Sequence, residues 1–138
     1  MAQPLIILSV SPVEEDHRSL ENIVGHSNWR LLRADGIPAA RTLLADYEIS
    51  VVLCESHLRE GSWIGLLDEL QSLPYPPCLI VTSATADERL WAEALNRGAW
   101  DVLAKPFNRS ELVRCVKIAW ENWYHRRPPA HQHSATAS

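Results

Sequence analysis

The chain is predicted to adopt an α/β fold in which a five-stranded parallel sheet lies between two layers of helices. Short apolar runs alternate, five times over, with stretches in which apolar residues recur every three or four positions. Two of the runs, at 50–54 and 78–82, consist of small or apolar residues, which is typical of strands buried on both faces of a parallel sheet. The 138 residues fit one domain with a substantial hydrophobic core.

The predicted elements alternate along the chain. The first helix is expected to have Ser11 as its N-cap, Pro12 in its first position and Glu14 completing a capping box, and to end near Gly25. Gly98 is expected to end the fourth helix. The strands are expected at 5–8, 29–33, 50–55, 78–82 and 102–103, and the helices at 12–24, 38–46, 63–70, 87–96 and 110–124.

The order of the strands places the candidate site. Right-handed crossovers leave few arrangements, and the flavodoxin-like three-layer (βα)5 sandwich with strand order 2-1-3-4-5 is the common one for five strands. In this order the first and third strands are neighbours, and ligands bind beyond their carboxyl ends. Glu55 ends the third strand and Ser9 follows the first, so we expect these two residues to lie close together.

The bulk composition excludes several classes of protein. A net charge of -4 lacks the basic surplus that is typical of nucleic-acid-binding proteins. No apolar run approaches the roughly 20 residues that span a bilayer, and no targeting segment is recognisable. Cys54, Cys78 and Cys115 are odd in number and widely spaced, which predicts buried thiols in a reducing compartment. We therefore expect a cytoplasmic protein that binds neither nucleic acid nor membrane.

Four stretches of the chain carry a resemblance to a known family. Glu55 is followed by Leu58 and by a loop that contains Gly61, and the fourth strand ends in the hydroxyl residues at 82–83. The sequence GAWD occupies 98–101, and LAKPF occupies 103–107. Together these stretches resemble a response-regulator receiver domain of the CheY-like kind, over about residues 4–124.

The resemblance implies two-component signal transduction and phosphorelay chemistry at the carboxyl ends of the strands. In a receiver, two acids after the first strand and an aspartate after the third hold a magnesium ion, and the aspartate accepts a phosphoryl group from a histidine kinase. A Ser or Thr after the fourth strand and a lysine after the fifth contact the phosphoryl group. The resemblance makes Glu55 the phosphoacceptor-equivalent residue and assigns Ser9, Val10, Ser83 and Lys105 to the pocket.

The sequence departs from the family pattern at three of these five positions. Ser9 and Val10 replace the acid pair, although valine offers no ligand and a hydroxyl is a poor substitute for a carboxylate. Glu55 extends its carboxylate about 1.5 Å further than an aspartate would, and in-line transfer is sensitive to such a displacement. The chain is thus identified as an atypical receiver without the metal-binding acid pair and the phosphoacceptor aspartate. We expect no catalytic residue and no bound cofactor, magnesium included.

Two questions about the pocket stay open in the sequence. Glu14, Glu15 and Asp16 either stabilise the start of the first helix, where negative charge suits the helix dipole, or fold back to replace the missing acids. Glu55 either meets Lys105, directly or through water, or is solvated in a pocket that has lost its function. Direct contact would partly imitate the lysine–phosphate link of an activated receiver.

A second candidate site lies on the face formed by the fourth helix, the fifth strand and the fifth helix, through which receivers commonly signal. Trp91 and Leu95 are four positions apart on the fourth helix, and Trp100 begins the fifth strand. Leu90 and Ala94 take the core-facing positions, so Trp91 is expected to point outward. Clustered exposed aromatics indicate an interaction surface, and homodimerisation and binding of another protein are both open. Partial burial under neighbouring side chains is the alternative.

These observations predict a receiver-like domain at 1–127 and a disordered C-terminal tail at 128–138, which carries no large apolar residue. The predicted function is a phosphorylation-independent protein-interaction module, not an enzyme, whose partner is a signalling protein or a histidine kinase. The alternative is a phosphorylatable receiver with an altered metal site. A pocket for a small ligand is a third reading, without a Gly-rich phosphate loop to support it.

Overall fold

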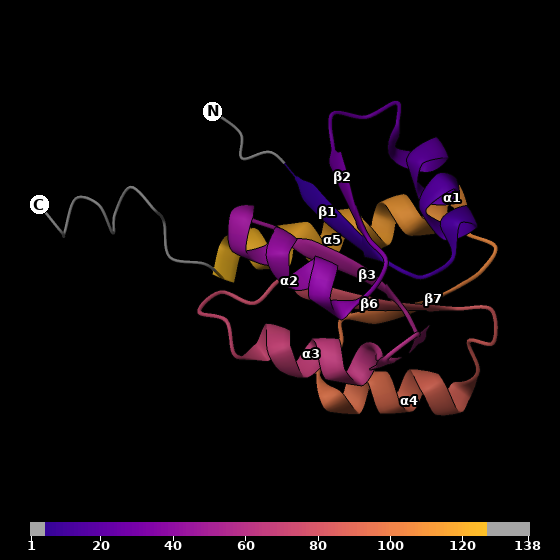
Figure 1. Cartoon of the computed structure of the whole chain (residues 1–138). Helices are drawn as coiled ribbons and strands as arrows, with labels where there is room; N and C mark the ends of the chain where they lie inside the picture. The colour runs from indigo at the N-terminus through magenta and orange to yellow at the C-terminus, as the bar shows by residue number, and fades with distance from the viewer. Residues whose placement is uncertain (1–4, 127–138) are drawn as a thin grey trace, which may run out of the picture.

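A five-stranded parallel sheet runs through the middle of the molecule in the computed structural model, which describes residues 5–126 (Figure 1). The spatial order of its strands, β2-β1-β3-β6-β7, is the predicted 2-1-3-4-5 arrangement, so the α/β, flavodoxin-like fold class is confirmed. The tail predicted at 128–138 lies outside the described residues. The strands are β1 (Ile6–Val10), β2 (Arg30–Ala34), β3 (Val51–Glu55), β6 (Cys78–Ser83) and β7 (Asp101–Ala104).

Helices cover both faces of the sheet (Figure 1). On one face lie α1 (Glu14–Val24) and α5 (Arg109–Arg126). On the other lie α2 (Ile37–Asp46), α3 (Trp63–Gln71) and α4 (Glu88–Arg97). Among the helices described between residues 5 and 126, none combines the length and apolar character needed to cross a membrane.

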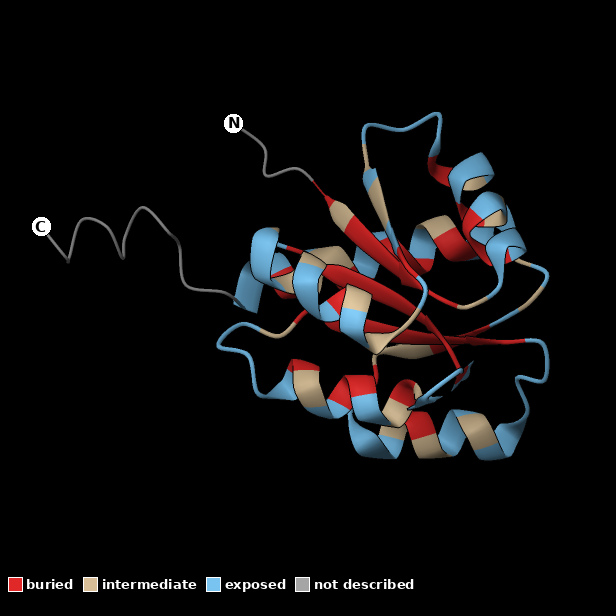
Figure 2. Cartoon of the chain, viewed as in Figure 1, coloured by how far each residue is buried: buried red, intermediate tan, exposed pale blue. Residues whose placement is uncertain are grey.

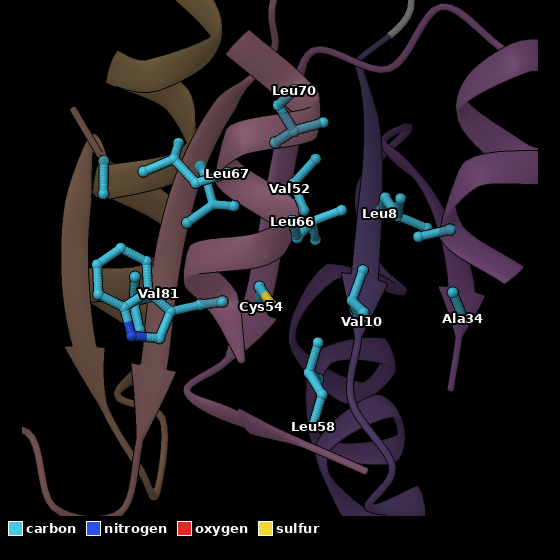
Figure 3. Packing of buried hydrophobic residues seen from close by; sticks show 14 of the residues in the cluster. Leu8, Val10, Ala34, Val52, Cys54, Leu58, Leu66, Leu67, Leu70 and Val81 are labelled. Carbon is cyan, nitrogen blue, oxygen red and sulfur yellow. The ribbon is translucent and has the colours of Figure 1, made fainter. Parts of the chain in front are cut away.

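Alternation of side chains along the strands determines which face each residue occupies. The central strands are buried along their length, as the red ribbons of Figure 2 show. Val52 and Cys54 pack towards α3 (Figure 3), whereas Val51 and Leu53 belong to the core beneath α1 and α5. Because side chains in a strand alternate between faces, Glu55 continues the row of Val51 and Leu53 and lies on the α1–α5 side.

The first strand is longer than the sequence predicts, and the first helix begins later. Because β1 extends to Val10, Ser9 lies within the strand rather than after it. Helix α1 starts at Glu14 with Val13 in the N-cap position, so the predicted capping box of Ser11 and Glu14 is wrong. The Ser11 hydroxyl instead accepts a hydrogen bond from the Val13 backbone N–H at 3.0 Å and donates to a buried carboxylate.

Helix α4 is secured at both ends. The Asp87 side chain accepts a hydrogen bond from the Leu90 backbone N–H at 2.9 Å. Gly98 ends the helix as predicted, with the left-handed φ of 104° that favours glycine. Next to it, the Gln71 side-chain amide at the end of α3 donates to the Arg97 carbonyl at 3.0 Å. Helices α3 and α4 are therefore joined at the C-terminal end of α4.

The loop after β3 contains a short hairpin that the sequence analysis did not predict. The antiparallel strands β4 (His57–Leu58) and β5 (Gly61–Ser62) are paired across a tight turn. Gly61 adopts a φ of 115°, a conformation that other residues rarely take. Ser62 then caps α3 by accepting a hydrogen bond from the Ile64 backbone N–H at 3.2 Å. The hairpin thus leads the chain directly from the end of β3 into α3.

Candidate functional site

Three charged side chains from distant parts of the chain meet at the carboxyl edge of the sheet. Lys105 follows β7, Glu55 ends β3, and Asp16 lies in the first turn of α1. The Lys105 Nζ atom is 2.9 Å and 3.1 Å from the two carboxylate oxygens of Asp16 and 2.5 Å from Glu55 Oε1. All three side chains are largely buried, and the lysine is the most exposed at 17%. One ammonium group therefore bridges two carboxylates, which we call the Lys105 triad.

Glu55 is held through both of its carboxylate oxygens. Oε2 accepts hydrogen bonds from the His57 backbone N–H and the Ser56 hydroxyl, each at 3.1 Å. Oε1 accepts no well-aligned hydrogen bond from any residue in the described range, so its contact with Lys105 is an ion pair. Of the two alternatives for Glu55, direct contact with Lys105 is therefore the one observed, and the solvated alternative is wrong.

Asp16 is the acid that folds back into the pocket. It is buried, whereas Glu14 and Glu15, which precede it in α1, are exposed. Besides its contacts with Lys105, Asp16 accepts a hydrogen bond from the Ser11 hydroxyl, whose oxygen is 2.6 Å from Oδ2. The reading in which all three acids serve only the helix dipole is thus wrong for Asp16.

The lysine of the triad remains charged at neutral pH. Burial lowers the pKa of Lys105, but the hydrogen bonds that it donates to Asp16, together with electrostatic attraction to Asp16 and Glu55, outweigh this effect and hold the pKa above its ordinary value. Because two carboxylates face one ammonium, the triad carries one net negative charge when all three groups are ionised.

A buried histidine next to the triad was missed in the sequence analysis. His17 Nδ1 lies 2.8 Å from the Ser9 hydroxyl oxygen, and Nε2 lies 2.9 Å from the Ser11 carbonyl oxygen. A carbonyl only accepts hydrogen bonds, so in the neutral ring Nε2 carries the proton and Nδ1 accepts from Ser9. The Ser9 hydroxyl, which the resemblance placed among the pocket groups, is therefore engaged by His17.

Of the other two pocket residues named from the sequence, one faces away from Glu55 and the other is linked to it. Val10 is fully buried and points to the opposite face of the sheet from Ser9, into the core with α3 (Figure 3). Its assignment to the pocket is wrong because neighbouring residues of a strand face opposite ways. The Ser83 hydroxyl oxygen lies 3.2 Å from that of Ser56, so it is linked to Glu55 through Ser56.

The arrangement does not fit a magnesium ion as receivers are expected to hold one. Magnesium requires several oxygen ligands, and here the Lys105 ammonium stands between the two carboxylates that would supply them. The Ser9 hydroxyl is bonded to His17, and Val10 faces away. Across residues 5–126, no group of three or more His, Cys, Asp or Glu side chains is positioned to hold a metal ion.

The second candidate site is a groove between α4, β7 and α5. Trp91 is 51% exposed, so its predicted outward orientation is confirmed, and Leu95 and Trp100 are half-buried. Trp91 and Trp100 line a groove of about 380 Å³ together with the exposed Ile118 of α5, which the sequence analysis did not include. Charged residues of both signs also line the groove: Asp101, Glu111 and Arg114.

The chain is similar to known proteins in both sequence and fold. The model of the response regulator receiver domain family matches residues 13–117. The transcriptional regulatory protein DpiA of Escherichia coli K12 is 32% identical over 116 residues, which cover 81% of this chain and 50% of DpiA. The regulatory protein AtoC of the same strain is 28% identical over 132 residues, which cover 96% of this chain and 29% of AtoC. The chain therefore spans about half, or less, of the length of these relatives.

Solved structures share the same architecture. The signal receiver domain of an HD domain-containing protein from Pseudomonas fluorescens Pf-5 superposes with a TM-score of 0.81 at 26% identity, covering 90% of this chain and 100% of that one. The beryllofluoride-activated NtrC4 receiver domain, solved as a dimer, gives a TM-score of 0.78 at 19% identity, covering 86% and 98%. At 19% identity, the similarity to the NtrC4 receiver domain is evidence for the fold alone.

Proposed function

This chain belongs to the family of response regulator receiver domains of two-component signal transduction, and we propose that it is an atypical member that binds a protein partner without phosphoryl transfer. The proposal rests on one observation above all, the Lys105 triad. The lysine that would contact a phosphoryl group is already paired with two carboxylates of its own chain. We therefore propose that the pocket holds a permanent conformation and no longer responds to phosphorylation.

Electrostatics and geometry both oppose phosphoryl transfer to Glu55. A phosphoryl group carries a charge of about −2 at neutral pH, and it would enter a site that already has an excess of one carboxylate. To reach Lys105 it would have to displace Asp16, which is buried and hydrogen-bonded to Ser11. The extra methylene of Glu55 also moves the acceptor oxygen out of the position that an aspartate would occupy.

A mass measurement tests this part of the proposal. The protein is mixed with a small phosphodonor and Mg²⁺, and its intact mass is recorded alongside a phosphorylatable receiver domain as positive control. We expect no added phosphoryl group. An added group that is absent from the Glu55→Gln variant would instead establish the alternative function, a phosphorylatable receiver with an altered metal site.

We propose the surface around Trp91, Leu95 and Trp100 as the site of protein binding. It combines exposed aromatic area with a groove and with charged residues at its edge, features typical of interfaces. The two classes of partner are a second copy of this chain and another signalling protein, such as a histidine kinase. The proposal assigns no catalytic residue to the chain, and a reducing cytoplasm fits its three buried free thiols.

Size measurement separates the two classes of partner. Native protein and the Trp91→Ala and Trp100→Ala variants are compared by size-exclusion chromatography with light scattering, and by capture of a candidate kinase. Tyr75→Ala is the matched control, because Tyr75 is also 51% exposed and does not line the groove. If neither tryptophan variant changes oligomer size or capture relative to Tyr75→Ala, this surface is not the interface.

A further inference from the structure

We infer that the Lys105 triad is a cation site whose cation is the chain's own ammonium group, and that removal of this group converts Asp16 and Glu55 into a site for a hard divalent cation. The inference rests on the proposed function and deepens it, because it names what occupies the pocket in place of a metal ion. It also assigns a ligand role to Asp16, which does not stand at the acid-pair positions that the resemblance names.

Carboxylate oxygens from two elements converge on one point. Three carboxylate oxygens from α1 and β3 lie between 2.5 Å and 3.1 Å from the Nζ atom of Lys105. Two largely buried carboxylates repel one another, so they share a site in the ionised form only when a positive charge stands between them. In the native protein that charge is the ammonium, which therefore marks the position that a cation takes.

Glu55 Oε1 depends on the ammonium group of Lys105. This buried atom accepts no hydrogen bond from the residues that the structure describes, so the neighbouring ammonium is what neutralises it. If Lys105 were shortened, Oε1 would face the vacated space as an unsatisfied acceptor. A metal ion with its water ligands meets this need better than an apolar side chain does.

A hydroxyl group adds to the oxygen atoms around the two carboxylates. The Ser11 hydroxyl donates to Asp16 Oδ2 at 2.6 Å, so it is a further oxygen next to one of the two carboxylates. Two carboxylates, a hydroxyl and water molecules make an oxygen-only set, which suits Mg²⁺, Mn²⁺ or Ca²⁺ rather than softer metals. The native protein excludes these ions because the ammonium and a divalent cation would repel each other at the same position.

Titration with Mn²⁺ tests the inference by calorimetry and by electron paramagnetic resonance of free Mn²⁺. The native protein is expected to show no saturable binding up to about 10 mM, whereas Lys105→Ala and Lys105→Met are expected to bind one ion with a Kd on the order of 1 mM or lower. Binding should be at least about tenfold weaker in Lys105→Ala combined with Glu55→Gln. Lys117→Ala, which removes the other lysine of the chain at an exposed position, should behave as the native protein does.

Thermal unfolding measures independently whether Mn²⁺ binds to the folded state of each protein. Mn²⁺ should raise the Tm of the Lys105 variants and leave that of the native protein unchanged, because a ligand stabilises only the state that binds it. A variant that is unfolded alone and folds on addition of Mn²⁺ supports the inference equally. Saturable binding to the native protein that requires Glu55 would overturn it, as would Lys105 variants that show neither binding nor stabilisation by Mn²⁺. Phosphorylation of the native chain would refute the proposed function instead, so the two failures are distinguishable.

Discussion

Replacement of Lys105 by methionine should destabilise the protein by an amount that depends on pH. Methionine retains much of the length of the lysine side chain but lacks its charge, so Asp16 and Glu55 would face each other without a cation between them. Loss of one partner from a buried ion pair typically costs about 3–5 kcal/mol, because the remaining charge stays buried. Here two charges would remain, and they would also repel each other.

Protonation of one of the two carboxylates limits the loss of stability in Lys105→Met. If one carboxyl becomes protonated, the repulsion is relieved and a hydrogen bond can replace the lost ion pair. Uptake of this proton becomes more favourable by about 1.36 kcal/mol for each unit by which the pH falls. We therefore expect Lys105→Met to lose about 3–4 kcal/mol of unfolding free energy at pH 7 and only about 1 kcal/mol at pH 5.

Urea unfolding followed by circular dichroism at the two pH values measures this difference. Lys117→Met serves as the matched control, since Lys117 is exposed and should contribute less than about 0.5 kcal/mol at either pH. Addition of Asp16→Asn to Lys105→Met should recover part of the loss at pH 7 by removing the repulsion. A loss for Lys105→Met that is equally large at both pH values, or below about 0.5 kcal/mol at pH 7, would refute the reasoning.

Three further predictions concern stability. The unfolding free energy of the native protein should fall as the pH rises above about 10.5, because the pKa of Lys105 is higher in the folded than in the unfolded state. The stability that this difference contributes is complete below the pKa of the unfolded state and is lost as the pH rises through the pKa of the folded state. Urea titrations at alkaline pH should show that Lys105→Met lacks this part of the loss. Leu66→Ala should lower the unfolding free energy by about 2–5 kcal/mol, because Leu66 of α3 is fully buried in the hydrophobic core. Leu73→Ala, at an exposed position, should change it by no more than about 0.5 kcal/mol in the same urea assay. Gly98→Ala should lower the thermal unfolding midpoint by the equivalent of about 1 kcal/mol or more, because φ is 104° and an added Cβ would lie 2.6 Å from the Gln71 side chain. Gly36→Ala is the control, because φ is −175° and space is available there, and it should change the midpoint little.

The sheet was predictable because its strands are short, apolar and separated by clear helix signals. The sequence also placed Glu55 and Lys105 at the same edge, since parallel strands end together. What the sequence analysis did not use was the alternation along the strands. Val51 and Leu53 lead to Glu55, and Leu103 leads to Lys105, so both charged residues fall on the side of α1 and α5. The same alternation places the Val10 side chain on the opposite face of the sheet, away from the pocket.

Asp16 was not distinguished from its two neighbours because the start of the first helix was misplaced. With Ser11 as N-cap, the three acids after it formed one group, with two alternatives: service to the helix dipole or folding back into the pocket. The buried face of α1 nevertheless contains a signal, since Asp16, Leu20 and Val24 follow one another at intervals of four and are all buried. Extension of the apolar row by one turn towards the N-terminus would have pointed Asp16 at the sheet. Its contact with Lys105, which lies 89 residues away, depends on tertiary packing that no local pattern contains.

The attachment of α4 at both ends has a consequence for the thermodynamics of recognition. Asp87 caps its first turn, and Gly98 and Gln71 hold its last, so unwinding of either end of the helix that carries Trp91 would break hydrogen bonds. A partner would then meet a surface that is already in its bound shape. Association with such a surface loses less conformational entropy than association with a helix that must first be ordered. Binding should accordingly involve side-chain adjustments rather than movement of the backbone, with a small heat-capacity contribution from folding of this region.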